Sequence, residues 1–178
     1  VQSRIPIINA AASQEGREFA MKNADFLFTP VFDFDQARDT VADISSRAVS
    51  VNRTVNVLTF CTVVCRPTQQ EAEDYLRWYA NENADWDAVD NLMTLQGLHA
   101  QSFTKEALGM FRDRFAAGHG GFPLVGTPDQ IADLLEQLSD TGISGTTLAF
   151  VDYAKEFPYF RQEVLPRLEA KGLRQPSQ

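Results

Sequence analysis

A strand that runs into a small-residue turn and then directly into a helix is the feature of this chain that most limits its possible folds. Residues 5–9 carry three isoleucines, residues 10–13 read Ala-Ala-Ala-Ser, and a helical pattern starts at Gln14. A second short apolar run, residues 24–28, follows within one helix length. Strand, turn, helix and strand in this order form a βαβ unit, which requires parallel strands and predicts an α/β fold.

The turn at residues 10–13 also predicts a site for an anion. The backbone N–H groups at the start of a helix point at one spot, and the helix dipole adds positive potential there. We expect Ser13 to bind a phosphate through its hydroxyl and N–H groups, with backbone contacts from Ala12 and Gly16. Two plainer interpretations stay open: Ser13 only caps its own helix, and Gly16 only allows that helix to pack closely.

The composition is that of an ordinary globular domain and excludes several classes of protein. The chain has 178 residues, 44% of them hydrophobic and 22% charged, which suffices for one core. The net charge of −8 argues against nucleic acid and against an anionic membrane surface, because both attract clustered Lys and Arg. No apolar run is long enough to span a bilayer. Cys61 and Cys65 lie in one apolar run and are interpreted as small buried hydrophobes of a reduced, cytoplasmic protein.

Four segments rich in Val, Ile, Phe, Leu or Thr are predicted as strands. They cover about residues 5–9, 24–28, 55–65 and 145–151. Their apolar runs are largely continuous, as in strands covered on both faces. Helices are expected over residues 14–23, 35–50, 68–80, 127–140 and 157–171. The whole chain, residues 1–178, is predicted as a single domain of parallel β/α units.

The segment 81–126 interrupts this alternation of strands and helices. It is rich in helix formers and has no predicted strand, so we expect a helical insertion that ends in the glycine-rich loop 118–121. Long excursions between regular elements often carry function. The loop is therefore a candidate lid that closes over a ligand.

Three blocks of the chain resemble the C-terminal half of the bacterial luciferase-like flavin monooxygenases. Residues 9–20 with 23–28 are similar to the family's fifth strand, phosphate turn and sixth strand, although Ala11 stands where the family commonly has glycine. Residues 57–65 with 68–73 are similar to the seventh strand and the start of the segment after it. The last helix–strand–helix unit is matched by residues 123–132, 142–150 and 164–168. Residues 83–86 and 120–126 most resemble the branch that includes pyrimidine, sulfone and alkanesulfonate monooxygenases.

This resemblance implies the C-terminal half of a TIM (β/α)8 barrel. It implies an enzyme that uses reduced FMN and dioxygen to oxygenate a small organic substrate, with a flavin reductase as partner and a homo-oligomeric state. It also implies a longer protein, because the family's first four β/α units have no counterpart here. The sheet edges at residues 5–9 and 145–151 would then be covered by those units or by another chain. Two alternatives stay open: a deazaflavin-dependent oxidoreductase with the same barrel, and a non-catalytic half-barrel that serves association.

Other candidate residues give no catalytic assignment. His99 and His119 are the only histidines, and such side chains can act as general acid or base near neutral pH. We interpret His99 as structural, and His119 as either a solvent-exposed loop residue or part of the lid. Trp78, Tyr79 and Trp86 are expected in the core or in subunit contacts rather than against a flavin. No motif for a metal site, a P-loop or a hydrolytic triad is recognisable in the sequence.

Overall fold

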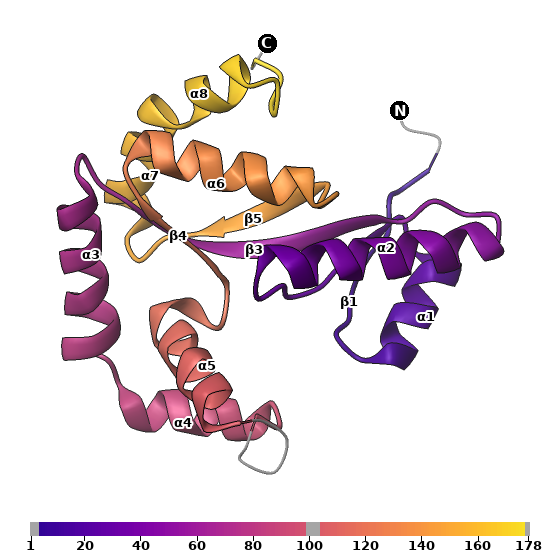
Figure 1. The fold of residues 1–178 in the computed structure, drawn as a ribbon, viewed down its shortest axis with the longest axis horizontal. Coiled ribbons are helices and arrows are strands. Elements are labelled where there is room, and N and C mark those ends of the chain that lie inside the picture. The colour runs from indigo at the N-terminus through magenta and orange to yellow at the C-terminus, as the bar shows by residue number, and fades with distance from the viewer. Residues whose placement is uncertain (1–3, 99–103, 177–178) are drawn as a thin grey trace. The chain divides into compact units, whose positions relative to one another are not determined.

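The computed structural model describes residues 4–98 and 104–176 (Figure 1). The chain separates into two compact units, Val1–Phe60 with Leu135–Thr147 and Cys61–Leu134 with Leu148–Gln178. The boundary between them passes through three elements: β3 (Asn56–Cys65), β5 (Gly145–Ala149) and α6 (Pro128–Asp140). The organisation as a single domain stays a prediction.

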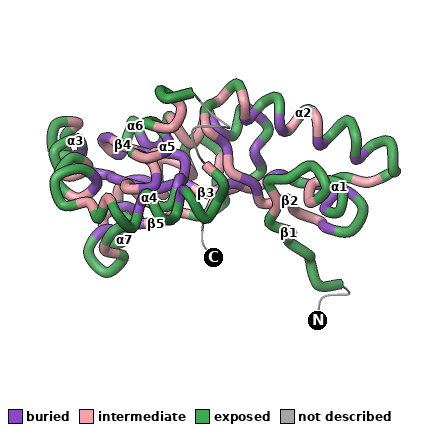
Figure 2. The backbone as a smooth tube through the Cα atoms, turned by 90° about the horizontal axis from the view of Figure 1, so that it is seen from below, coloured by how far each residue is buried: buried purple, intermediate pink, exposed green. Residues whose placement is uncertain are grey.

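The first unit is built from two short strands and two helices with the first half of β3. These elements are β1 (Ile8–Ala10), α1 (Gln14–Asn23), β2 (Phe26–Phe28) and α2 (Phe34–Ser50). β1 pairs with β2 and β2 pairs with β3, both in parallel. The helix α2 buries residues at three- and four-residue spacing, which Figure 2 shows as alternating buried and exposed segments. Its inward side chains are Ala37, Thr40, Ile44 and Ala48.

The second unit combines the second half of β3 with most of the helices. Its elements are α3 (Gln69–Arg77), the π-helical turn η1 (Trp78–Glu82), α4 (Trp86–Leu95), α5 (Lys105–Gly118), β4 (Phe122–Gly126), α7 (Tyr153–Glu163) and α8 (Leu165–Ala170). β4 pairs in parallel with β3, with Phe122 opposite Cys61. α3 packs on β4. α4 packs on α5 (Figure 1). Val63, Leu124 and Phe160 are at most 1% exposed and belong to the core of this unit.

The four predicted strands are present and are neighbours in chain order: β1 pairs with β2, β2 with β3, and β5 with β3. Their ends differ from the prediction. Regular pairing of β1 starts only at Ile8, since Pro6 has no N–H and the Ile7 N–H donates to the Asp25 carboxylate at 2.8 Å. β5 ends at Ala149, two residues earlier than expected.

The prediction that residues 81–126 contain no strand is wrong. Residues Phe122–Gly126 form β4, paired with β3 along its whole length. A proline and flanking glycines argue against a strand in sequence. Pro123 is tolerated because its fixed φ suits an extended backbone at the edge of a sheet.

The last predicted helix is two helices. α7 ends at Glu163 and α8 starts at Leu165. Pro166 has no N–H to continue the hydrogen-bond ladder of α7, and its ring clashes with the carbonyl four residues earlier. The chain therefore restarts a helix after Val164, whose carbonyl accepts from the Leu168 N–H at 3.1 Å.

The expectation that strands are covered on both faces fails at β1. Ile8 in β1 is 60% exposed, and Ile7 just before it is 48% exposed. Val57 and Val63 in β3 are each 1% exposed.

Among the described helices, none combines the length and the apolar character needed to cross a bilayer.

Candidate functional site

The turn after β1 places Ser13 at the start of α1. Its backbone is extended, with φ −72° and ψ 158°, and its Oγ accepts a hydrogen bond from the Gly16 N–H at 3.2 Å. Ser13 is therefore the N-cap of α1. A hydroxyl that accepts one hydrogen bond still carries a hydrogen to donate, so this cap leaves a donor for a ligand.

Two further donors of this turn are free. The Arg17 N–H donates to the Ser13 carbonyl at 3.0 Å, and the Gly16 N–H is used by the cap. Within residues 4–98 and 104–176, the N–H groups of Gln14 and Glu15 have no hydrogen-bond acceptor. Free N–H groups at the positive end of a ten-residue helix are suited to an anion.

Gly16 and Ala11 determine the shape of the turn. A Cβ added to Gly16 would lie 2.6 Å from the Cβ of Ala11, closer than two such atoms can approach. The Ala11 N–H donates to the Phe28 carbonyl at 3.0 Å, which ties the turn to β2. Ala12 and Ser13 are both exposed and so can be reached by a ligand. Ala11 does not adopt a positive φ, so an alanine at this position costs no backbone strain.

Sequence reasoning missed Arg17. Its Nε is buried and has no hydrogen-bond partner in the described part of the chain. Arg17 lies four residues after Ser13, a spacing that places two residues on the same side of a helix and that could have identified it. Its guanidinium adds a positive charge to the first turn of α1.

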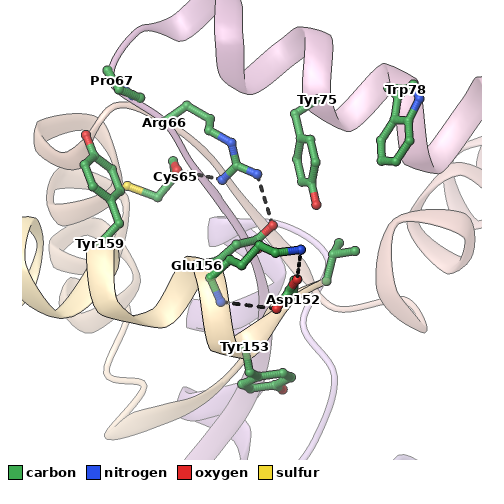
Figure 3. A pocket seen from close by; sticks show the side chains of 11 residues that line it. Cys65, Arg66, Pro67, Tyr75, Trp78, Asp152, Tyr153, Glu156 and Tyr159 are labelled. Atoms are coloured by element: carbon green, nitrogen blue, oxygen red, sulfur yellow. Dashed lines mark hydrogen bonds and ion pairs between the residues drawn. The ribbon is translucent and has the colours of Figure 1, made fainter.

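A second site lies in the second unit, where the chain leaves β3 (Figure 3). It is a cleft of about 790 Å³ between the end of β3, α3 and the start of α7. The guanidinium of Arg66 lies 3.9 Å from the ring centroid of Tyr75. Its Nη2 donates to Glu156 Oε1 at 3.0 Å. The remaining lining residues are Cys65, Pro67, Trp78, Val151, Asp152, Tyr153, Lys155 and Tyr159.

Burial dominates the electrostatics of this cleft. The side chains of Arg66 and Glu156 are only 21% and 8% exposed, so their pairing takes place largely out of water. Burial, followed by the neighbouring Glu156 carboxylate, raises the pKa of Tyr75. Burial also raises the pKa of Cys65 to about 11, so this buried, unbonded cysteine is a neutral thiol at physiological pH.

The rim of the cleft carries a second pair of charged groups. Asp152 caps α7, and its carboxylate lies 2.7 Å from the Lys155 Nζ. The Lys155 side chain, through its hydrogen bond, lowers the pKa of Asp152. Both groups are therefore charged at neutral pH and compensate each other.

A smaller cavity of about 310 Å³ lies between β3, β4, α3 and α5. Tyr79 lines it and donates its hydroxyl to the Ala117 carbonyl at 3.0 Å. Burial raises the pKa of Tyr79 to about 12, so its hydroxyl stays protonated. Tyr79 thus joins η1 to the end of α5.

The glycine-rich segment 118–121 is a helix cap rather than an extended loop. His119 terminates α5 in a left-handed conformation with φ 54°, and the Gly120 N–H donates to the Arg114 carbonyl at 3.1 Å. β4 starts immediately afterwards, at Phe122. His119 is exposed, and its ring lies 3.2 Å from the Gln96 amide. Movement of this segment as a lid stays a prediction, and His99 lies outside the described residues.

The two tryptophans have different surroundings. Trp78 is 52% exposed and borders the cleft, so it is not the core residue that the sequence suggested. Trp86 lies under the Arg112 guanidinium at 4.1 Å. Whether either of them contacts another subunit stays a prediction.

Comparison with known proteins identifies the family. The model of the luciferase-like monooxygenases matches residues 1–145 of the chain. The chain belongs to this family. Among curated relatives of this luciferase-like chain, the FMNH2-dependent dimethylsulfone monooxygenase of Pseudomonas fluorescens (strain Pf0-1) is 29% identical over 182 residues, which cover 95% of this chain and 48% of the relative. The dimethyl-sulfide monooxygenase of Hyphomicrobium sulfonivorans is 28% identical over 208 residues, which cover 98% of this chain and 43% of that relative.

A solved structure supports the same fold. DmoA from Hyphomicrobium sulfonivorans superposes with a TM-score of 0.80 at 23% identity, over 96% of this chain and 42% of that one. The luciferase-like chain therefore spans about half the length of the proteins it matches. Its parallel β/α units form part of a barrel, as the resemblance implied.

Proposed function

We propose that the whole protein is an FMN-dependent monooxygenase, which uses reduced flavin and dioxygen to oxygenate a small organic substrate. The names of the two relatives support a flavin-dependent reaction on a small sulfone or sulfide. The observation in this chain that carries the proposal is the anion-suited turn between β1 and α1, centred on Ser13.

The residues of this turn fit the phosphate of FMN. The Ser13 hydroxyl and the N–H groups of Gln14 and Glu15 are unused donors, and the turn is open to solvent at Ala12 and Ser13. Arg17 adds a positive charge in the first turn of the helix. Glu15 adds one negative charge to the first turn, which disfavours an anion there, and the positive charge of Arg17 compensates it.

Ser13 and Ala12 would hold the phosphate group in this proposal, and Gly16, whose N–H is used by the Ser13 cap, would shape the turn. The flavin, when bound, supplies the electron transfer to dioxygen. Ser13 donates a hydrogen bond to a phosphate oxygen, Ala12 contributes its backbone, and Gly16 leaves space for the turn to close on Ala11. The helix dipole of α1 adds favourable potential for the negative charge.

The proposed partners follow from this reaction. A flavin reductase supplies reduced FMN, dioxygen is the oxidant, and the protein is a homo-oligomer. The exposed apolar surface at β1, where Ile8 is 60% exposed, is covered by the rest of the barrel or by another chain. A deazaflavin-dependent oxidoreductase and a non-catalytic association module are less well supported, because the two relatives are named as monooxygenases.

The test measures whether the whole protein incorporates one oxygen atom of dioxygen into each product molecule. The protein is supplied with NADH, FMN and a purified flavin reductase under ¹⁸O₂, with dimethyl sulfone and dimethyl sulfide as substrates. We expect one ¹⁸O atom in the product and no product without the reductase. Turnover that needs a deazaflavin and proceeds without oxygen would instead identify the oxidoreductase alternative.

A further inference from the structure

The cleft at the end of β3 contains a buried carboxylate oxygen that the described chain leaves without a donor. Glu156 Oε1 accepts from Arg66, but Glu156 Oε2 is buried and has no hydrogen-bond partner among the described residues. The Glu156 side chain is only 8% exposed, so water contributes little. A buried acceptor in this state carries a desolvation penalty that a ligand with an N–H or O–H group relieves.

Arg66 offers the complementary group beside this oxygen. Its Nη1 donates to the Cys65 carbonyl at 2.9 Å, and its Nη2 donates to Glu156 at 3.0 Å. Its guanidinium is held against Tyr75. A guanidinium has five N–H groups and two are used here, so further donors remain for an acceptor on a ligand.

The walls of the cleft are aromatic. Trp78 and Tyr75 stack with ring centroids 5.8 Å apart. Tyr153 and Tyr159 of α7 also line the cleft, Tyr159 on the side of Cys65 and Pro67 (Figure 3). The volume of about 790 Å³ lies within the range of small-molecule pockets. Such walls favour a compact ring that packs against them.

The charges select a neutral ligand. An anion attracted to Arg66 would meet the free oxygen of Glu156, and a cation attracted to Glu156 would meet Arg66. At the rim, Asp152 and Lys155 compensate each other at 2.7 Å. A neutral group with a donor beside an acceptor satisfies both buried partners.

We propose that this cleft binds a small neutral ring compound that carries adjacent N–H and C=O groups, the edge of a cyclic amide. The N–H donates to Glu156 Oε2, and the C=O accepts from Arg66. The ring lies on the side of the cleft that Tyr75 and Trp78 line (Figure 3). This inference does not rest on the proposed function, because binding is read without flavin.

Trp78 provides a direct measurement. The chain has two tryptophans, so Trp86→Phe leaves Trp78 as the only one and makes its fluorescence report on the cleft. The full chain with this substitution is titrated with 2-piperidinone, and with N-methyl-2-piperidinone and acetate as controls. We expect saturable binding of 2-piperidinone, and binding of the N-methyl compound weaker by about fivefold or more, since it cannot satisfy Glu156. Equal affinities, tighter binding of acetate, or no saturable change would overturn the proposal.

A variant pair tests the role of Glu156. Glu156→Gln should weaken the binding of 2-piperidinone by about fivefold or more, because a neutral acceptor replaces a charged one. It should leave the affinity for the N-methyl compound unchanged. Glu163→Gln, on the same helix but outside the cleft, should change neither. If Glu156→Gln binds 2-piperidinone as tightly as the parent, the proposed contact is wrong. Circular dichroism verifies that the variant is folded. The comparison of 2-piperidinone with N-methyl-2-piperidinone on the parent protein does not depend on this variant.

Discussion

The Cβ of Ala11 occupies the space that a side chain at Gly16 would need, since the two Cβ atoms would be 2.6 Å apart. Ala11 is tied to β2 through its N–H, and Gly16 donates its N–H to the Ser13 cap. The two residues therefore fix the distance between the end of β1 and the first turn of α1. The geometry of the proposed phosphate site depends on this contact.

We predict that Gly16→Ala destabilises the protein by about 1–3 kcal/mol, because the added methyl group forces Ala11 or the cap to move. Gly109→Ala is the matched control. Gly109 lies inside α5, and a methyl group added to it would have no atom within 4 Å, so this change should stabilise by about 0.5–1 kcal/mol. Chemical denaturation of both variants measures the difference. A destabilisation at Gly109 equal to that at Gly16 would contradict the steric explanation.

The pair Arg66–Glu156 joins positions ninety residues apart in the sequence. Glu156→Ala should cost about 3–5 kcal/mol, because it leaves a buried guanidinium without its partner. Asp43→Ala, which breaks the exposed pair with Arg47 on α2, should cost less than about 1 kcal/mol. A double-mutant cycle with Arg66→Met isolates the coupling. If the cycle gives no coupling energy, the pair does not contribute to stability.

Cys65 should react slowly with alkylating agents in the folded protein. Burial raises its pKa to about 11 from an ordinary value of 9.0. Because the neutral thiol is favoured in the folded state, stability should fall as the pH rises from about 9, where the unfolded thiol ionises, toward 11. In a Cys61→Ala variant, iodoacetamide labelling at pH 8, followed by mass spectrometry, should be about a hundredfold slower than in denaturant. Equal rates would show that Cys65 is accessible and ionised.

Asp25 should make stability depend on pH in the acid range. Its carboxylate accepts from the Ile7 N–H at 2.8 Å, and this hydrogen bond, with help from Arg4, lowers the pKa of Asp25. The stabilisation is complete above the unfolded value of about 3.9 and is lost as the pH falls through the lower folded value. The difference in Tm between wild type and Asp25→Asn should therefore shrink as the pH is lowered below about 4. A difference that is constant with pH would mean that the charge of Asp25 is unimportant.

Much of the fold could be predicted because it depends on local patterns. The apolar run 55–65 differs from β3 by one residue, and the cap Thr127 with Pro128 marks the start of α6. β4 was missed because Pro123 and Gly126 argue against a strand, whereas its stability comes from pairing with β3, which is distant in sequence. The break between α7 and α8 lies next to Pro166, but a proline alone does not locate it, because Pro158 lies inside α7 without ending that helix.

The candidate sites were predictable to different degrees. Ser13 is found from sequence because a cap and its helix are neighbours along the chain. The cleft around Arg66 and Glu156 is not, because it forms only when the end of β3 and the start of α7 come together. A single glutamate inside a helix gives no signal of burial in the sequence. Arg17 lies between these cases, since its spacing from Ser13 is visible but its unpartnered Nε is not.

The affinity of the whole protein for FMN in wild type, Ser13→Ala and Ser46→Ala tests the proposed phosphate site most directly. Ser46 is an exposed serine on α2 whose Oγ donates to the Asp43 carbonyl, and it serves as the control. If Ser13 donates to the phosphate, Ser13→Ala should weaken FMN binding by about 1–2 kcal/mol, the scale of a hydrogen bond to a charged group, and leave riboflavin binding unchanged. Ser46→Ala should bind FMN as wild type does. Equal FMN affinities for wild type and Ser13→Ala in isothermal titration calorimetry would mean that Ser13 is only a helix cap and that the phosphate binds elsewhere.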